Sequence, residues 1–168
     1  MINWMYYPKN MQVDNISEKI INIFESLEDS IDSDTCTYSS NEVLSILEPD
    51  LTLNGFCVEK GKHIQDKIHV PVLFGLNGKI EKAFDADAYA TKYKYVIEVE
   101  AGRAVVNYQF LKDFFEACTM FDVNYLCVAV RNKYRGSNDF QKVCLFFDTL
   151  YQCGRVGIPL NGLLIIGY

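Results

Sequence analysis

Residues 84–103 read FDADAYATKYKYVIEVEAGR, and much of the predicted fold follows from this stretch. Apolar and polar residues alternate in it, as they do in β-strands, where successive side chains point to opposite faces. Near its end, Ile97 and Val99 share one face, and Glu98 and Glu100 share the other. Two further aspartates precede them. Carboxylates gathered on neighbouring strands repel one another, so the segment indicates a site as well as a fold.

The two halves of this segment are expected to form a hairpin with its turn centred on residues 92–93. In that register Asp87 lies opposite Glu98, and Asp85 lies opposite Glu100, with Cβ atoms about 5 Å apart. A divalent cation between the strands would offset the repulsion, and hard oxygen ligands suit Mg²⁺ or Mn²⁺. The alternative is a solvated strand face that neighbouring lysines neutralise. A slip of the register by two residues would exchange the two aspartates.

The residues before this hairpin predict helices and then strands. Apolar residues at helical spacing predict a helix over 15–31 that is capped at Asn15. A capping box of Ser39 and Glu42 predicts a short second helix that Pro49 ends. From there the apolar period changes to two. Strands are predicted over 55–60, 68–75, 79–90 and 93–101, and together they form an antiparallel meander.

The Asn77-Gly78 dipeptide is a strong hairpin signal between the second and third of these strands. After the meander, the pattern predicts a helix over 103–119, a strand buried on both faces over 123–131, a helix over 137–152 and a final strand over 162–168. The fold class is therefore α/β, with a mixed central sheet flanked by helices. We expect one domain over residues 1–168, with a helical part at 1–50 and the sheet core at 53–168.

Composition narrows the class of protein. Hydrophobic residues make up 49% of the 168 residues, as in a globular chain with one sizeable core. No apolar run reaches the ~18 residues of a membrane helix, and the first residues lack a signal-peptide pattern. We therefore expect a cytoplasmic protein with no membrane partner. Six cysteines without a CxxC pair, and only two histidines, argue against zinc.

The net charge of −6 is unevenly distributed along the chain. Residues 1–60 carry a net charge of −8, and residues 61–168 carry +2. The acidic balance argues against unspecific phosphate binding, but binding responds to the local field, so a basic face in the second part remains compatible with it.

The acidic hairpin resembles the restriction-endonuclease-like PD-(D/E)XK nuclease superfamily. The matching residues are Asp87 and, after ten intervening residues, Glu98-Val99-Glu100, followed by a helix and a strand. Most members have lysine at the third motif position, and the BamHI-type E-x-E variant has glutamate there. The resemblance covers residues 55–168. It implies a restriction-endonuclease-like core and Mg²⁺-dependent hydrolysis of phosphodiester bonds, with Mn²⁺ as a substitute ion.

Carried over to this chain, the resemblance makes Asp87 and Glu98 metal ligands, and Asp85 competes with Asp87 for its position. Glu100 would orient or deprotonate the attacking water, directly or through the metal. Positive charge for the transition state would come from Arg103 or from Lys112. Glu59, on the preceding strand, is a further candidate ligand that we expect to be solvated.

Basic residues elsewhere are candidates for nucleic-acid contacts. They are Arg131, Lys133 and Arg135 after the buried strand, and Lys62 in an earlier basic loop. Tyr134 would stack on a base. We expect DNA rather than RNA as the substrate. A homodimer is also expected, because a domain of this size has little surface for reading a sequence, and the acidic N-terminal helix would serve its interface. A non-catalytic nucleic-acid-binding or scaffold module that keeps the fold is the alternative function.

Overall fold

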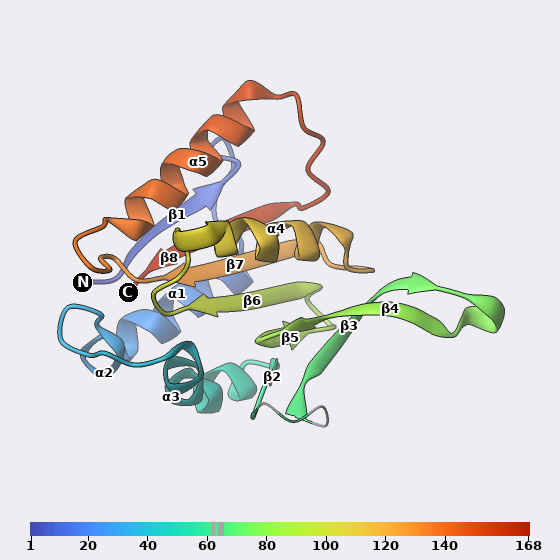
Figure 1. Ribbon diagram of the computed structural model, residues 1–168, viewed down its shortest axis with the longest axis horizontal. Helices are drawn as coiled ribbons and strands as arrows, with labels where there is room; N and C mark the ends of the chain where they lie inside the picture. Colours follow the sequence, from blue (N-terminus) through green and yellow to red (C-terminus); the bar gives the residue numbers. More distant parts are fainter. Residues whose placement is uncertain (62, 64–65) are drawn as a thin grey trace.

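The protein is mixed α/β, and a six-stranded sheet forms its centre (Figure 1). The computed structural model describes residues 1–61, 63 and 66–168. The strands are β1 (Asn3–Tyr7), β2 (Cys57–Val58), β3 (Ile68–Phe74), β4 (Ile80–Ala86), β5 (Ala88–Ala90), β6 (Tyr95–Glu100), β7 (Tyr125–Val130) and β8 (Gly162–Gly167). The α-helices are α1 (Asn15–Ser26), α2 (Glu28–Ile31), α3 (Ser40–Leu53), α4 (Gln109–Thr119) and α5 (Asp139–Cys153).

The strand order in the central sheet is β1-β8-β7-β6-β5-β2. Strands β6, β7 and β8 run parallel, and β1, β5 and β2 each run antiparallel to their neighbours. The residues of β7 and β8 are almost all buried, which agrees with the continuous apolar runs that predicted strands covered on both faces. The parallel arrangement brings the carboxyl ends of β6, β7 and β8 to one edge of the sheet.

Helices cover the sheet on both faces, and each face has its own apolar core. Helices α1 and α3 pack on one face with Ile97 and Val99 of β6. Helices α4 and α5 pack on the other face with Val96 of β6. Because side chains alternate along a strand, Glu98 and Glu100 point to the same face as Val96, beneath α4. The sheet therefore separates the apolar α1/α3 layer from a layer that contains carboxyl groups.

Strands β3 and β4 leave the sheet as a two-stranded arm, which we name the β3–β4 arm, residues 68–86 (Figure 1). Its turn contains Asn77 and Gly78, both with positive φ angles, so the predicted hairpin is confirmed. The predicted four-strand meander is wrong. Strand β2 pairs with β5 instead of with β3, because the chain bends at Asp87 and separates β4 from β5.

The N-terminal part also differs from the prediction. Residues 3–7 form β1, which pairs with β8, so this part is not wholly helical and belongs to the sheet. Helix α1 is capped by Asp14, whose carboxylate accepts the N–H groups of Ile16 and Ser17, and not by Asn15. The capping box of α3 is confirmed, but α3 continues past Pro49 to Leu53. The last turn survives because the buried Leu51 extends the apolar stripe of the helix.

Helix α4 begins at Gln109, six residues later than predicted. The intervening chain cannot be regular helix, since Gly102, Asn107 and Tyr108 all have positive φ angles. The other late elements, β7, α5 and β8, lie close to where the apolar pattern placed them. No helix in the described part of the chain is long and apolar enough to cross a membrane.

Candidate functional site

The predicted register of the acidic hairpin is confirmed where the two strands pair. Ala88 pairs with Ile97, and Ala90 pairs with Tyr95, as a turn centred on residues 92–93 requires. The ladder ends at Ala88, so Asp87 lies one residue beyond it. The Asp87 carboxylate accepts a hydrogen bond of 2.8 Å from the backbone N–H of Val99. The side chain of Asp87 is therefore held against the strand segment that carries Glu98 and Glu100.

A fourth acidic residue, Asp113, joins this group from α4. Its side chain is only 5% exposed, and one carboxylate oxygen, Oδ1, accepts a hydrogen bond of 3.3 Å from Gln109. The other oxygen, Oδ2, is buried and receives no hydrogen bond from an N–H or hydroxyl group among the described residues, although the neighbouring Glu100 can share a proton with Asp113. A buried carboxylate oxygen without a partner is costly, and such orphaned atoms often mark a place where an ion or water binds. We name Asp87, Glu98, Glu100 and Asp113 the acidic cluster.

The acidic cluster has unusual protonation. Burial raises the pKa of Asp87 to about 6, against the opposing effect of the Val99 hydrogen bond. Burial, followed by the charges of Asp87 and Asp113, holds the pKa of Glu98 well above its ordinary value. Burial, followed by the charges of Asp113 and Asp87, raises the pKa of Glu100 to about 8. Burial and the charge of Asp87 raise the pKa of Asp113 to about 6. Glu100 therefore keeps its proton near neutral pH unless a cation displaces it, whereas Asp87, with its pKa of about 6, is mostly ionised there.

Lys112 brings positive charge to the acidic cluster. Its Nζ atom lies 3.2 Å from a carboxylate oxygen of Glu116 and 4.0 Å from Oδ1 of Asp113. The Lys112 charge also acts to lower the pKa values of Asp87 and Glu100. Arg103, the other candidate, is exposed and lies in the irregular segment after β6. Of the two candidates for the missing motif lysine, Lys112 is the one whose charge acts on the acidic cluster.

Glu59 is not solvated, contrary to our expectation. Its carboxylate is only 7% exposed, and both oxygens lie 3.0 Å from Nζ of Lys67. The backbone N–H of Glu59 donates a 2.8 Å hydrogen bond to the carbonyl oxygen of Asp87. The Glu59–Lys67 pair therefore lies directly beside Asp87, where the negative charge of Glu59 helps to raise the pKa of Asp87.

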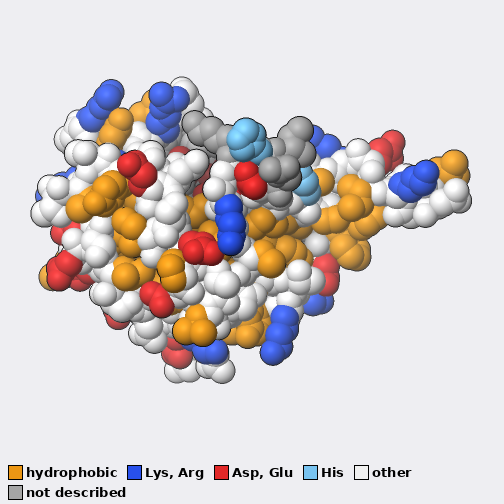
Figure 2. Space-filling view, turned by 90° about the horizontal axis from the view of Figure 1, so that it is seen from below, with side chains coloured by type: hydrophobic (Ala, Val, Ile, Leu, Met, Phe, Trp, Pro, Cys, Tyr) orange, Lys and Arg blue, Asp and Glu red, His pale blue; other side chains and the backbone are white. Residues whose placement is uncertain are grey.

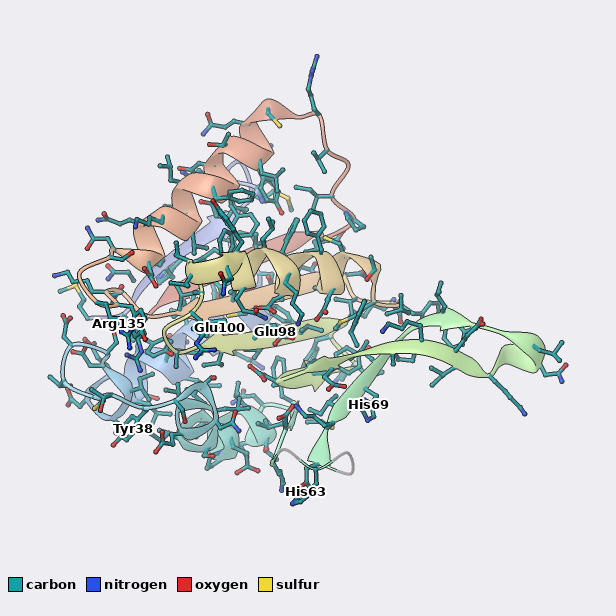
Figure 3. All side chains as sticks on the ribbon, viewed as in Figure 1. Tyr38, His63, His69, Glu98, Glu100 and Arg135 are labelled. Carbon is teal, nitrogen blue, oxygen red and sulfur yellow. The ribbon has the colours of Figure 1, made fainter. Side chains whose placement is uncertain are left out.

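Asp85 occupies a different region, and its predicted position opposite Glu100 is wrong. It lies on the β3–β4 arm, where it pairs with His69, and the two side chains are 2.7 Å apart. Its other carboxylate oxygen lies 3.9 Å from Nζ of Lys67, so Lys67 links Asp85 to the Glu59 carboxylate. Both side chains are 48% exposed. Because β4 leaves the sheet before Asp87, Asp85 cannot share a strand pair with β6. In Figure 3, His69 lies at the arm and away from Glu98 and Glu100 on β6.

The cluster offers hard oxygen ligands, but not a closed cage. Among residues 1–61, 63 and 66–168, no three histidine, cysteine, aspartate or glutamate side chains are arranged closely enough to hold one metal ion together. The predicted set of four ligands, Asp85, Asp87, Glu98 and Glu100, is thus not assembled. The unpartnered Oδ2 atom of Asp113 and the crowded carboxyls still fit the chemistry of a small divalent cation.

Three of the predicted nucleic-acid residues follow β7, at the same sheet edge as Glu100. The guanidinium carbons of Arg131 and Arg135 lie 5.3 and 5.2 Å from the ring centroid of Tyr134. That ring rests on Gly102, where a Cβ atom would come within 2.6 Å of it. Figure 3 shows Arg135 near the end of β6 that carries Glu100. Lys133 is exposed in the same loop.

The loop after β7 is also tied to the rest of the molecule. The Arg131 guanidinium donates a hydrogen bond to the carbonyl oxygen of Tyr38, before α3. Lys62, the fourth predicted nucleic-acid residue, lies outside the described residues.

Comparisons with known proteins give no match to this chain among protein-family models, curated proteins or solved structures. A function must therefore be supported by the residues themselves.

Sequence reasoning missed two residues of the site. Asp113 stands between Phe110 and Ala117 at the spacing of the buried face of α4, and a carboxylate at a core position was the available signal. Lys67 gave no such signal, because it lies outside any regular strand, where no residue periodicity indicates which way its side chain points.

Proposed function

We propose that this protein is a Mg²⁺-dependent nuclease with a restriction-endonuclease-like core, and that DNA is its substrate. The observation that carries the proposal is the 2.8 Å hydrogen bond from Val99 N–H to the Asp87 carboxylate. It holds the Asp87 carboxylate against β6, the strand that carries the other two motif residues, Glu98 and Glu100.

The order of elements around these residues supports the same proposal. Helix α3 precedes β2, β5 carries Asp87 at its start, β6 carries Glu98 and Glu100, and α4 and β7 follow. This order resembles the helix, meander, helix and strand of the PD-(D/E)XK superfamily. The β3–β4 arm is then an insertion between the first two strands of that core.

Asp87 and Glu98 are the proposed protein ligands for Mg²⁺. Mg²⁺ is commonly held by only one or two carboxylates, with waters and substrate phosphate oxygens completing the shell, so a cage of three protein ligands is not required. When bound, the ion would polarise the phosphodiester and make a water more acidic. The proposed role of Glu100 is to orient this water and accept its proton.

Lys112 and the residues after β7 are proposed to bind the nucleic acid. Lys112 adds the positive charge that most family members place in the motif itself, and it stabilises the charge that develops on the phosphate. Arg131, Lys133 and Arg135 contact backbone phosphates beside the site. Because these side chains recognise phosphates rather than bases, they explain binding without explaining sequence preference.

The test is cleavage of supercoiled plasmid DNA, with RNA as the competing substrate, in Mg²⁺, Mn²⁺ or EDTA. We expect nicking with either ion and none in EDTA. Asp87→Asn should lower the cleavage rate at least ~100-fold. Asp85→Asn is the matched control, because it makes the same change two residues away on the exposed arm, and we expect the rate to stay within about threefold of wild type.

Loss of activity in Asp85→Asn, or cleavage that persists in Asp87→Asn, would contradict the assignment. The absence of any three-ligand group in the described residues favours a second candidate, a nucleic-acid-binding module without turnover. That candidate predicts DNA binding weakened by Arg135→Gln, with no cleavage in any divalent cation.

A further inference from the structure

The edge of the sheet that carries Glu100 continues across β7 to the end of β8. Glu100 pairs with Val130, and Val130 pairs with Gly167, so the three residues lie at one level of the sheet. Neighbouring strands are about 4.8 Å apart, which places Gly167 roughly 10 Å from Glu100. Gly167 is two residues beyond Ile165, which belongs to the core beneath α4 and α5, so both positions face the same side of the sheet as Glu100.

A small polar pocket lies at this end of β8, where α5 begins beside the two ends of the chain (Figure 1). Its volume is about 260 Å³. The pocket depends on Gly167, because a Cβ atom there would come within 2.7 Å of the Phe140 ring and closer still to Oδ1 of Asn132. The residues that line it include four amides, one lysine and one aromatic ring, from Asn3, Asn132, Asn138, Gln141, Lys133 and Phe140.

Hydrogen bonds hold the amide side chains of the pocket in place. Nδ2 of Asn3 donates to Oδ1 of Asn132 at 3.1 Å, and Nδ2 of Asn132 donates to the Met1 carbonyl oxygen at 2.8 Å. On α5, Nδ2 of Asn138 donates to Oε1 of Gln141 at 3.3 Å. Among the described residues, no group bonds to Oδ1 of Asn3, Oδ1 of Asn138 or Nε2 of Gln141. The pocket therefore offers oriented acceptors and a donor to a ligand.

These residue types are the ones that recognise nucleobases. Amide side chains present a donor beside an acceptor, as the edges of bases do, and the carboxylate of Asp34, which also lines the pocket, can accept from a base amino group. Phe140 supplies a flat ring on which a base can stack, and Lys133 supplies positive charge for the adjoining phosphate. The ring of Tyr134, the predicted stacking residue, already packs against two guanidinium groups and Gly102.

We propose that this pocket binds one unpaired base of the strand that the acidic cluster cuts. The proposal rests on the proposed nuclease function and adds the class of substrate, which is single-stranded DNA or a duplex with one base extruded. The pocket has room for one base and not for a base pair, so a base of an intact duplex must leave its stack to enter. Nucleotides of a stacked strand rise about 3.4 Å each, so the bound base lies within about three nucleotides of the phosphate at Glu100.

Fluorescence anisotropy of labelled oligonucleotides with the full chain, in EDTA, tests the pocket. The probes are a single strand of mixed sequence and the same strand with an abasic residue at every position, which keeps the phosphates and removes the bases. We expect the base-bearing strand to bind at least ~10-fold more tightly. A duplex with one bulged base should also bind more tightly than the intact duplex, because the bulged base is already unpaired.

Variants of the pocket should remove this preference for bases. The double variant Asn138→Ala/Gln141→Ala, and separately Phe140→Leu, should each reduce it to less than about threefold and leave binding of the abasic strand unchanged. Both amide residues are exposed, and Asn138 makes no side-chain capping hydrogen bond to α5, so the double variant should fold as wild type does. Gln152→Ala, at an exposed position in the last turn of α5, is the matched control and should keep the full preference.

Equal binding of the base-bearing and abasic strands overturns the proposal. So does a chain that binds neither strand, or a preference for bases that both pocket variants retain. The binding assay contains no metal ion, so its outcome is separate from that of the cleavage assay. A chain that prefers bases but cuts no DNA contradicts the nuclease activity alone, and a chain that nicks plasmid DNA but binds both strands equally contradicts the base pocket alone.

Discussion

Asp85 and Asp87 stand two residues apart, yet the fold sends them to different regions. Asp87 is partly buried directly before β5, accepts a hydrogen bond from Val99 and has a raised pKa. Asp85 lies on the β3–β4 arm and pairs with an exposed histidine. One aspartate thus lies in a crowded acidic cluster, and the other lies in a half-exposed pair with His69. Strand pairing, not residue type, decides which aspartate has unusual chemistry.

The two regions also differ in how they use apolar surface. The sheet is covered on both faces, and its side chains are buried in two cores. The outer part of the arm leaves Leu73, Leu76 and Ile80 exposed to solvent, and Figure 2 shows hydrophobic side chains along the arm. We therefore expect substitutions of buried side chains in the body to change the free energy of unfolding strongly, and substitutions of these exposed side chains in the arm to change it little.

The largest difference should come from truncating apolar side chains in the two regions. Phe147→Ala removes a fully buried ring from the α5 side of the sheet and should lower the free energy of unfolding by about 3–5 kcal/mol. Leu76→Ala, at a position 83% exposed, should change it by less than about 0.5 kcal/mol. Urea denaturation at a dilution that keeps the chain monomeric measures both. Equal losses would show that the arm is packed in solution.

A smaller effect should appear in the pH dependence of stability. Because burial and neighbouring charges raise the pKa of Glu98 in the folded state, that state binds more protons than the unfolded state above about pH 4.5. The unfolding free energy contributed by this group therefore falls as the pH rises. Glu98→Gln removes this penalty and should stabilise the protein at pH 8 by about 1–3 kcal/mol, with little difference near pH 4.

Asp85→Asn is the control for that experiment, because exposed ion pairs contribute only about 0–1 kcal/mol. Its unfolding free energy should differ little from that of wild type at either pH. A Glu98→Gln variant that is less stable than wild type at pH 8 would show that Glu98 is charged and paired in the folded protein, and the account of the acidic cluster would then be wrong.

The acidic site could be predicted only in part from the sequence. Alternation and the hairpin register placed Asp87 beside Glu98, and local pattern is sufficient for such neighbours. The same local pattern gave the wrong position for Asp85, because no sequence signal shows that the chain bends at Asp87 and that β4 leaves the sheet. The local pattern also did not reveal Asp113 as a site residue, because its approach to β6 depends on how α4 packs on the sheet.

The secondary structure, like the acidic site, could be predicted only in part from the sequence. Long apolar runs and helical spacing identified β7, β8 and α5, because burial itself produces those patterns. The short strand β1 was missed because its pairing with β8 joins the two ends of the chain, and nothing local signals such a contact. Helix α3 continues beyond Pro49 because the packing of Leu51 outweighs the hydrogen bond that proline removes. Helix propensity alone does not show this balance of energies.

The most direct test of the central claim is an anomalous-difference map from crystals soaked in Mn²⁺ at pH 8, where Asp87, with its pKa of about 6, is ionised and free to bind a cation. The account predicts one peak bound by oxygens of Asp87 and Glu98 beneath α4. A peak at the Asp85–His69 pair, or a map without a peak in the acidic cluster, would contradict it.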